Sequence, residues 1–139
     1  MAKNKAIAPF LKWVGGKRQL MSAITPLLPD DFDQLKYYEP FVGGGAVLFH
    51  LQPQKAVIND FNKELVNVYK VIKNAPQALI ENLKIHENRE DYFYAVREWD
   101  RKTLYDKLSD VTKASRILFL NKTCSVSYTH LTLPTIYSV

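Results

Sequence analysis

The spacing of hydrophobic and polar residues predicts a βαβ unit in the first half of the chain. Residues 36–39 and 55–60 are short runs typical of strands, and the apolar stretch 46–51 between them predicts a short helix. Pro40 and the three glycines at 43–45 separate the first strand from this helix. Because a helix connects the two strands, we expect them to pair in parallel.

From residue 61 to residue 124 the apolar residues recur at helical spacing, and we expect this region to be helical throughout. Its first helix carries an apolar stripe made of Phe61, Leu65, Val68 and Ile72. Residues that can cap a helix by accepting a backbone N–H hydrogen bond precede the later helices. They are Asn74, Asn88 and Ser109. A shorter stretch with apolar residues at helical spacing lies upstream, at residues 20–27.

The glycine turn and the second strand bring polar chemistry to one end of the βαβ unit. Glycines at 43–45 let a ligand approach the backbone closely, and the helix that follows offers free N–H groups. Asp60 ends the second strand, and its separation from Gly43 is close to the ~20 residues expected for an acid that binds ribose hydroxyls. The pattern predicts a nucleoside pocket, with a glycine turn that binds nothing as the alternative.

The order of the glycines favours a cofactor without a pyrophosphate group. A dinucleotide-binding turn has the pattern Gly-x-Gly-x-x-Gly, and here Leu48 stands where the third glycine is required. S-adenosylmethionine has a ribose and an adenine and carries an amino acid at its other end. A glycine bend that passes beneath this amino acid therefore fits it better.

A second candidate loop, residues 12–17, has the sequence Lys-Trp-Val-Gly-Gly-Lys. It is not a loop for nucleoside triphosphates, because Leu11 replaces the first glycine of that motif and Arg18 replaces the hydroxyl residue that binds magnesium. In a cofactor pocket, Trp13 would form an apolar wall and Lys17 would pair with a carboxylate. A surface turn with a packed tryptophan is the alternative.

The composition of the 139 residues sets limits on the class of protein. Hydrophobic residues make up 47% and charged residues 24%, as in a globular domain or part of one. The single cysteine, Cys124, excludes a disulfide framework, and the spacing of the three histidines suggests no metal site. With no apolar run of ~20 residues and no signal peptide, we expect a cytoplasmic location. The formal net charge of +5 suits a polyanionic partner such as nucleic acid.

The two loops and the acid together resemble a known family. Residues 9–17 (Pro-Phe-Leu-Lys-Trp-Val-Gly-Gly-Lys), 38–46 (Tyr-Glu-Pro-Phe-Val-Gly-Gly-Gly-Ala) and 58–60 (Ile-Asn-Asp) closely resemble the N-terminal part of Dam-type DNA adenine-N6 methyltransferases. The resemblance implies an α/β fold. Residues 1–60 would form part of a Rossmann-like, S-adenosylmethionine-dependent methyltransferase core, and residues 61–124 part of a helical target-recognition region. It also implies a bacterial or phage-type monomer that acts on double-stranded DNA.

The resemblance assigns site residues by position. The residues that it implies for cofactor binding are Trp13, Lys17, Pro40, Phe41, Gly43, Gly45 and Asp60. The residues that it implies for DNA binding are Asn121 and Lys122, in a segment that resembles the approach to the family's DNA-reading hairpin. It implies no metal ligand.

The resemblance ends near residue 124. Residues 125–139 contain no Lys, Arg, Asp or Glu, and we expect them to be a non-matching tail that is artefactual or disordered. The family's catalytic Asp-Pro-Pro-Tyr motif, which holds the amine of a flipped adenine, is absent because none of the seven prolines has a proline neighbour. We therefore expect no catalytic residue in this chain and no activity from it alone. A non-catalytic module that binds S-adenosylmethionine or a nucleotide, and a helical interaction protein, are the alternatives.

Overall fold

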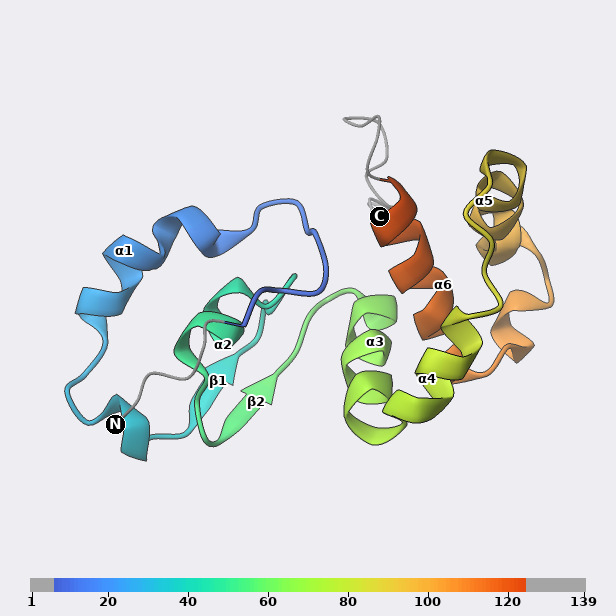
Figure 1. Cartoon of the computed structure of the whole chain (residues 1–139). Coiled ribbons are helices and arrows are strands. Elements are labelled where there is room, and N and C mark those ends of the chain that lie inside the picture. Colours follow the sequence, from blue (N-terminus) through green and yellow to red (C-terminus); the bar gives the residue numbers. More distant parts are fainter. Residues whose placement is uncertain (1–6, 125–139) are drawn as a thin grey trace. The chain divides into compact units, whose positions relative to one another are not determined.

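A computed structural model of the chain describes residues 7–124, so the expected tail at 125–139 lies outside the described residues. The chain forms two compact units that divide between Phe61 and Asn62 (Figure 1). We call them the sheet unit, which ends at Phe61, and the helical unit, which begins at Asn62. Among residues 7–124, no helix is long and apolar enough to cross a lipid bilayer.

The sheet unit is built on two parallel strands, as the pattern predicts. Strand β1 (Tyr37–Glu39) pairs with β2 (Ala56–Ile58) in parallel, and helix α2 (Ala46–Leu51) connects them (Figure 1). The pairing continues past the strands, because the Asn59 N–H donates to the Glu39 carbonyl (2.8 Å) and the Val42 N–H donates to the Asn59 carbonyl (2.9 Å). The carboxyl ends of both strands therefore meet at the glycine turn.

The helical repeat at 20–27 forms three short turns rather than one helix. They are a 3₁₀ turn η1 (Lys17–Leu20), helix α1 (Met21–Ile24) and a 3₁₀ turn η2 (Thr25–Leu27). Pro26 contributes to this break, since it has no N–H to donate to the preceding turn. A further 3₁₀ turn, η3 (Phe32–Gln34), precedes β1. The buried core of the sheet unit consists of Leu11, Met21, Val42 and Val47.

The helical unit contains four α-helices and two 3₁₀ turns in its described part. They are α3 (Lys63–Asn74), α4 (Pro76–Leu83), α5 (Glu90–Arg97), η4 (Glu98–Arg101), η5 (Tyr105–Lys107) and α6 (Asp110–Thr123). Helix α6 packs against α3, α4 and α5 (Figure 1). Its residues 114–121 are all buried, as in a helix that is covered on every side.

One of the three predicted helix caps is confirmed. The Ser109 hydroxyl accepts a hydrogen bond from the Thr112 N–H at 3.1 Å and caps α6. The prediction for Asn74 is wrong, because this residue ends α3, and the next helix begins at Pro76, whose ring favours the first helical position. The prediction for Asn88 is also wrong: the residue before α5 is Arg89, and its side chain makes no capping hydrogen bond.

The start of α3 differs from the expected apolar stripe. The Asn62 side chain accepts a hydrogen bond from the Leu65 N–H at 3.1 Å, so the helix begins after Asn62. Phe61 lies outside the helix and is 91% exposed. The buried face of α3 is made of Leu65, Val68 and Val71.

Candidate functional site

The first part of the site is the Trp13 loop, residues 12–16, which leads directly into η1. Its backbone turns at Gly15, where φ is +74°, a conformation that residues with a side chain rarely adopt. A Cβ atom at this position would meet no heavy atom within 4 Å, so the glycine leaves open space on that side of the loop. The backbone of the Trp13 loop is therefore accessible where it borders the site.

The second part is the glycine loop, residues 40–45, between β1 and α2. Gly43 and Gly45 have φ angles of +52° and +79°, and Gly45 is the residue that precedes the first turn of α2. The Val42 side chain is buried, and its carbonyl accepts a hydrogen bond from the Gly45 N–H at 2.9 Å. The loop is thus a tight turn that is anchored at its centre.

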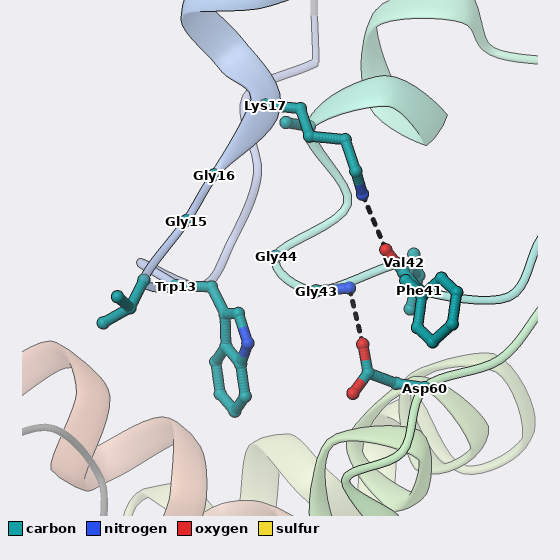
Figure 2. A pocket seen from close by; sticks show the side chains of 11 residues that line it. Trp13, Gly15, Gly16, Lys17, Phe41, Val42, Gly43, Gly44 and Asp60 are labelled. Carbon is teal, nitrogen blue, oxygen red and sulfur yellow. Dashed lines mark hydrogen bonds between the residues drawn. The ribbon is translucent and has the colours of Figure 1, made fainter. Parts of the chain in front are cut away.

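The Trp13 loop and the glycine loop pack directly against each other (Figure 2). A Cβ atom on Gly44 would lie 2.9 Å from the Leu11 carbonyl oxygen and 3.2 Å from the Trp13 Cβ. A Cβ atom on Gly43 would lie 3.2 Å from the indole Cδ1 of Trp13. We expected the glycines to admit a ligand, but these contacts give them a second role. They allow two chain segments that are distant in sequence to form one surface.

Asp60 joins this surface from the end of β2. Its Oδ2 atom accepts a hydrogen bond from the Gly43 N–H at 2.9 Å (Figure 2). The acid and the glycine turn, which the sequence places on two different strands, therefore touch. The parallel pairing of β1 and β2 causes this contact, because it brings the carboxyl ends of both strands to the same edge.

Lys17 connects the two loops through its ammonium group. The Lys17 Nζ donates to the Phe41 carbonyl oxygen at 2.7 Å (Figure 2) and lies 3.1 Å from the Glu39 Oε1. The other oxygen of Glu39, Oε2, accepts a hydrogen bond from the Tyr37 hydroxyl at 2.7 Å. Burial and the neighbouring Glu39 carboxylate raise the pKa of Tyr37 well above its usual range, so the hydroxyl stays protonated and remains a donor.

Glu39 and Tyr37 are neighbours of the cavity-lining Lys17 that the sequence reasoning missed. We assigned Lys17 to a ligand carboxylate, whereas in the structure its ion-pair partner is the buried Glu39, whose residue is only 7% exposed. The sequence does contain a sign of Glu39, because this acid ends a predicted strand directly before Pro40 and the glycine turn. The pairing of Glu39 with Lys17 could not be predicted, because Lys17 lies 22 residues upstream.

These elements enclose a cavity of about 260 Å³. Five of the residues that we expected to bind a cofactor line it, namely Trp13, Lys17, Phe41, Gly43 and Asp60 (Figure 2). Two of them do not line the cavity. Pro40 is exposed and directly precedes the lining residue Phe41, and Gly45 is buried at the start of α2. The structure thus brings together most of the predicted residues, whereas Pro40 and Gly45 lie outside the cavity lining, and Gly45 adopts a positive φ where the glycine loop enters α2.

The lining of the cavity suits a ligand that has both apolar and polar parts. It combines an indole ring, a carboxylate, an ammonium group and several backbone segments without a Cβ atom. The volume is below the ~300–1,000 Å³ of typical small-molecule pockets, so the cavity covers a part of such a ligand. A carboxylate can bind hydroxyl groups, and an ammonium can bind a carboxylate.

The predicted DNA-binding residues lie in the helical unit, near the end of α6. Lys122 is exposed, whereas Asn121 is only 9% exposed. The two neighbours therefore differ in what they offer to a partner: Lys122 presents a charge to solvent, and Asn121 is largely covered. No group of His, Cys, Asp and Glu side chains within residues 7–124 could hold a metal ion.

Comparison with known proteins identifies the family. Residues 13–132 match the family model of the D12 class N6 adenine-specific DNA methyltransferases. The chain belongs to this family. The matched residues include residues 13–16 of the Trp13 loop, the whole glycine loop, Asp60 and all the helices described in the helical unit. They also extend into the segment beyond residue 124, which the structure does not describe.

Individual methyltransferases align with most of this chain. It is 48% identical over 123 residues to the type II methyltransferase M1.LlaDCHI of Lactococcus lactis subsp. cremoris, an alignment that covers 86% of this chain and 43% of the relative. It is 41% identical over 134 residues to the type II methyltransferase M.MjaIII of Methanocaldococcus jannaschii, covering 85% of this chain and 46% of the relative. A DNA adenine methylase of Haemophilus influenzae is 36% identical over 94 residues, 64% of this chain and 32% of the relative. The chain spans less than half the length of these relatives.

Proposed function

We propose that the chain is the cofactor-binding and target-recognition portion of an enzyme that transfers a methyl group from S-adenosylmethionine to adenine N6 in DNA. The observation that carries this proposal is that the Trp13 loop, the glycine loop and Asp60 line the same cavity. Membership of an adenine-specific DNA methyltransferase family supports the reaction and the substrate. We infer that the two-stranded sheet unit is part of a Rossmann-like methyltransferase core.

The residues around the cavity fit the parts of this cofactor. We assign the Asp60 carboxylate to the ribose hydroxyls, because a carboxylate accepts hydrogen bonds from both hydroxyls of a diol. The Trp13 indole offers an apolar wall for the nucleoside, and the Lys17 ammonium offers a partner for the amino-acid carboxylate. When bound, the cofactor supplies an activated methyl group on a positively charged sulfur. The chain's own residues bind and orient it.

Binding measurements on the purified 139-residue chain test the cofactor assignment. In calorimetric titration we expect saturable binding of S-adenosylmethionine and no saturable binding of NAD, whose pyrophosphate has no matching glycine pattern. Absence of S-adenosylmethionine binding by the folded chain would contradict the proposal. Preferential binding of NAD would replace it with a dinucleotide-binding function.

We propose that the helical unit binds double-stranded DNA through backbone phosphates. The exposed Lys122 at the end of α6 and the net charge of +5 support this assignment. Binding by this chain is then sequence-independent and weakens steeply with salt. Substitution of Lys122 by Gln is expected to lower the slope of log affinity against log salt by about 1, as for the loss of one phosphate contact.

Fluorescence anisotropy with a labelled duplex at several salt concentrations measures this slope. Lys73→Gln is the matched control, because Lys73 is also exposed but lies at the end of a different helix, α3. If both substitutions leave the slope unchanged, the phosphate contact of Lys122 is excluded. If the chain prefers one short sequence at physiological salt, DNA recognition is not limited to the backbone.

A further inference from the structure

We propose that Tyr37 is a positioning residue for the amino-acid end of the cofactor pocket and that it acts through Glu39 on Lys17. This inference rests on the proposed cofactor binding. Tyr37 is not among the residues that line the cavity, so its effect would reach the ligand only through its neighbours. Three hydrogen-bonded contacts in the sheet unit carry the argument.

The contacts form a continuous chain from β1 to the glycine loop. The Tyr37 hydroxyl donates to Oε2 of Glu39 at 2.7 Å, and Lys17 donates to Oε1 of the same carboxylate at 3.1 Å. Lys17 donates in addition to the Phe41 carbonyl at 2.7 Å. Each oxygen of the carboxylate thus receives a donor from a different segment, and this fixes the rotation of the carboxylate about its axis.

The burial of Glu39 makes this fixation necessary. Its side chain is 8% exposed, so water offers little replacement for a lost donor, whereas the Lys17 side chain is 38% exposed and can reach a ligand. Without the Tyr37 hydroxyl, Oε2 would compete with Oε1 for the same ammonium group. Lys17 would then occupy several positions, and fewer of them would suit a ligand carboxylate.

The fold determines the direction in which the Tyr37 hydroxyl points. Tyr37 and Glu39 are two residues apart on β1 and therefore face the same side of the sheet. The backbone N–H of Tyr37 donates to the Lys55 carbonyl at 2.9 Å, and the ring packs edge to face against Phe32, with ring centres 6.2 Å apart. The backbone of Tyr37 is therefore held in the sheet, the ring contacts Phe32, and the hydroxyl at the far end of the ring donates to the Glu39 carboxylate.

A pair of ligands separates a positioning role from a structural one. S-adenosylhomocysteine carries the amino-acid end, whereas 5′-methylthioadenosine has the same nucleoside and sulfur with a methyl group instead. Tyr37→Phe removes the hydroxyl and keeps the ring. We expect it to weaken binding of S-adenosylhomocysteine about tenfold, or ~1.4 kcal/mol, by the loss of one ordered charge-assisted contact. Binding of 5′-methylthioadenosine should change less than about twofold, since it makes no contact with Lys17.

Two further variants complete the experiment. Lys17→Met should reproduce the selective loss, and the double variant should bind S-adenosylhomocysteine no more weakly than Lys17→Met alone, because Tyr37 acts through Lys17. Tyr38→Phe is the matched control: this tyrosine is next in sequence, faces the other side of β1 and is 62% exposed. It should leave both affinities unchanged.

Each outcome decides between the two proposals. Equal weakening of both ligands by Tyr37→Phe, unchanged binding of both, or additive losses in the double variant would overturn the positioning role while the cofactor proposal stands. Failure of the unsubstituted chain to bind either ligand would overturn the cofactor proposal and the positioning role with it. Selective and non-additive loss would support both.

Discussion

Buried charged side chains occur in both units of the molecule, but their surroundings differ. In the sheet unit, the buried Glu39 is paired with Lys17, whose side chain lines a cavity. In the helical unit, Arg116 is only 2% exposed, and its hydrogen bonds go to backbone carbonyls within the same unit. A buried charge therefore does not identify a ligand site by itself. What matters is whether its partner borders a cavity.

Arg116 closes the end of a neighbouring helix. Its guanidinium donates to the carbonyls of Val96 (2.9 Å) and Arg97 (2.7 Å), which are the last two carbonyls of α5. It also lies 3.1 Å from an oxygen of Asp100 and packs over the ring of Tyr105. The charge is thus used to join α6 to the α5–η5 segment. This is a structural role within the helical unit, whereas Lys17 also lines a cavity.

The largest effect that we expect concerns catalysis. We predict that the 139-residue chain binds the cofactor but transfers no methyl group. Transfer needs the cofactor and the target amine held in line, and such positioning supplies ~7–11 kcal/mol of barrier lowering. The chain has no Asp-Pro-Pro-Tyr segment to hold the amine. Incubation with tritium-labelled S-adenosylmethionine and adenine-containing duplex DNA is expected to give no incorporation above a no-enzyme control. Incorporated label would show that the helical unit carries chemistry that we have not assigned.

The next effect tests the structural role of Arg116. Arg116→Ala leaves two helix-end carbonyls and the Asp100 carboxylate without this donor, and we expect a loss of ~3–5 kcal/mol in unfolding free energy. Arg101→Ala is the control, because Arg101 forms an exposed pair with Glu98 at 2.8 Å that contributes well under ~1 kcal/mol. Urea unfolding followed by circular dichroism measures both. Similar losses in the two variants would show that the buried Arg116 contributes no more to stability than an exposed arginine.

Local features of the fold could be predicted from the sequence, because they depend on neighbouring residues. Helix α2 has the predicted bounds of 46–51, and Ser109 caps α6 as expected. The parallel pairing followed from the helical connection between the strands. In each case, apolar spacing, glycine punctuation or a capping side chain acts within a few residues of the structure that it determines.

Features that depend on distant partners were missed. The Lys17–Glu39 pair joins residues 22 positions apart, and the contact of Arg116 with Val96 joins residues 20 apart. No spacing rule relates such residues, since packing alone decides which charge meets which acceptor. Gly44 shows the same limit: its lack of a Cβ is required by the Leu11 carbonyl of another loop. The residues of the candidate site could therefore be predicted from the sequence, but the contacts between them could not.

A smaller effect tests the assignment of Asp60 to the ribose. Asp60→Ala is expected to weaken S-adenosylmethionine binding by ~1–3 kcal/mol, the range for a hydrogen bond to a charged group. Asp33→Ala serves as the control, since Asp33 is an exposed acid of the same unit in η3, outside the cavity lining. Calorimetric titration compares the two. Because the Gly43 N–H also loses its acceptor, thermal unfolding of each variant must be measured alongside. Unchanged affinity in a folded Asp60→Ala chain would remove Asp60 from the site.

The smallest effect that we expect is a pH dependence of the stability of the helical unit. It arises from His86, an ionisable group that contacts neighbouring side chains. Its ring stacks on Phe119 with centres 4.6 Å apart, Nδ1 lies 3.1 Å from the Tyr92 hydroxyl, and Nε2 lies 2.9 Å from the Ser115 hydroxyl. Burial lowers the pKa of His86 below its usual value of 6.5. The folded chain therefore favours the neutral imidazole.

The direction of the effect on stability follows from this shift. In the unfolded chain His86 takes up a proton as the pH falls through about 6.5, whereas the folded chain resists protonation until a lower pH. The stabilisation by the neutral ring is thus complete above pH ~6.5 and declines as the pH falls toward the lowered pKa. Thermal unfolding between pH 7.5 and 5 should show a smaller decrease in His86→Gln, whose amide does not titrate, than in the unsubstituted chain. His50→Gln, at an exposed position of the sheet unit, is the control. Parallel decreases in all three chains would mean that carboxylate protonation elsewhere, and not His86, sets the pH dependence.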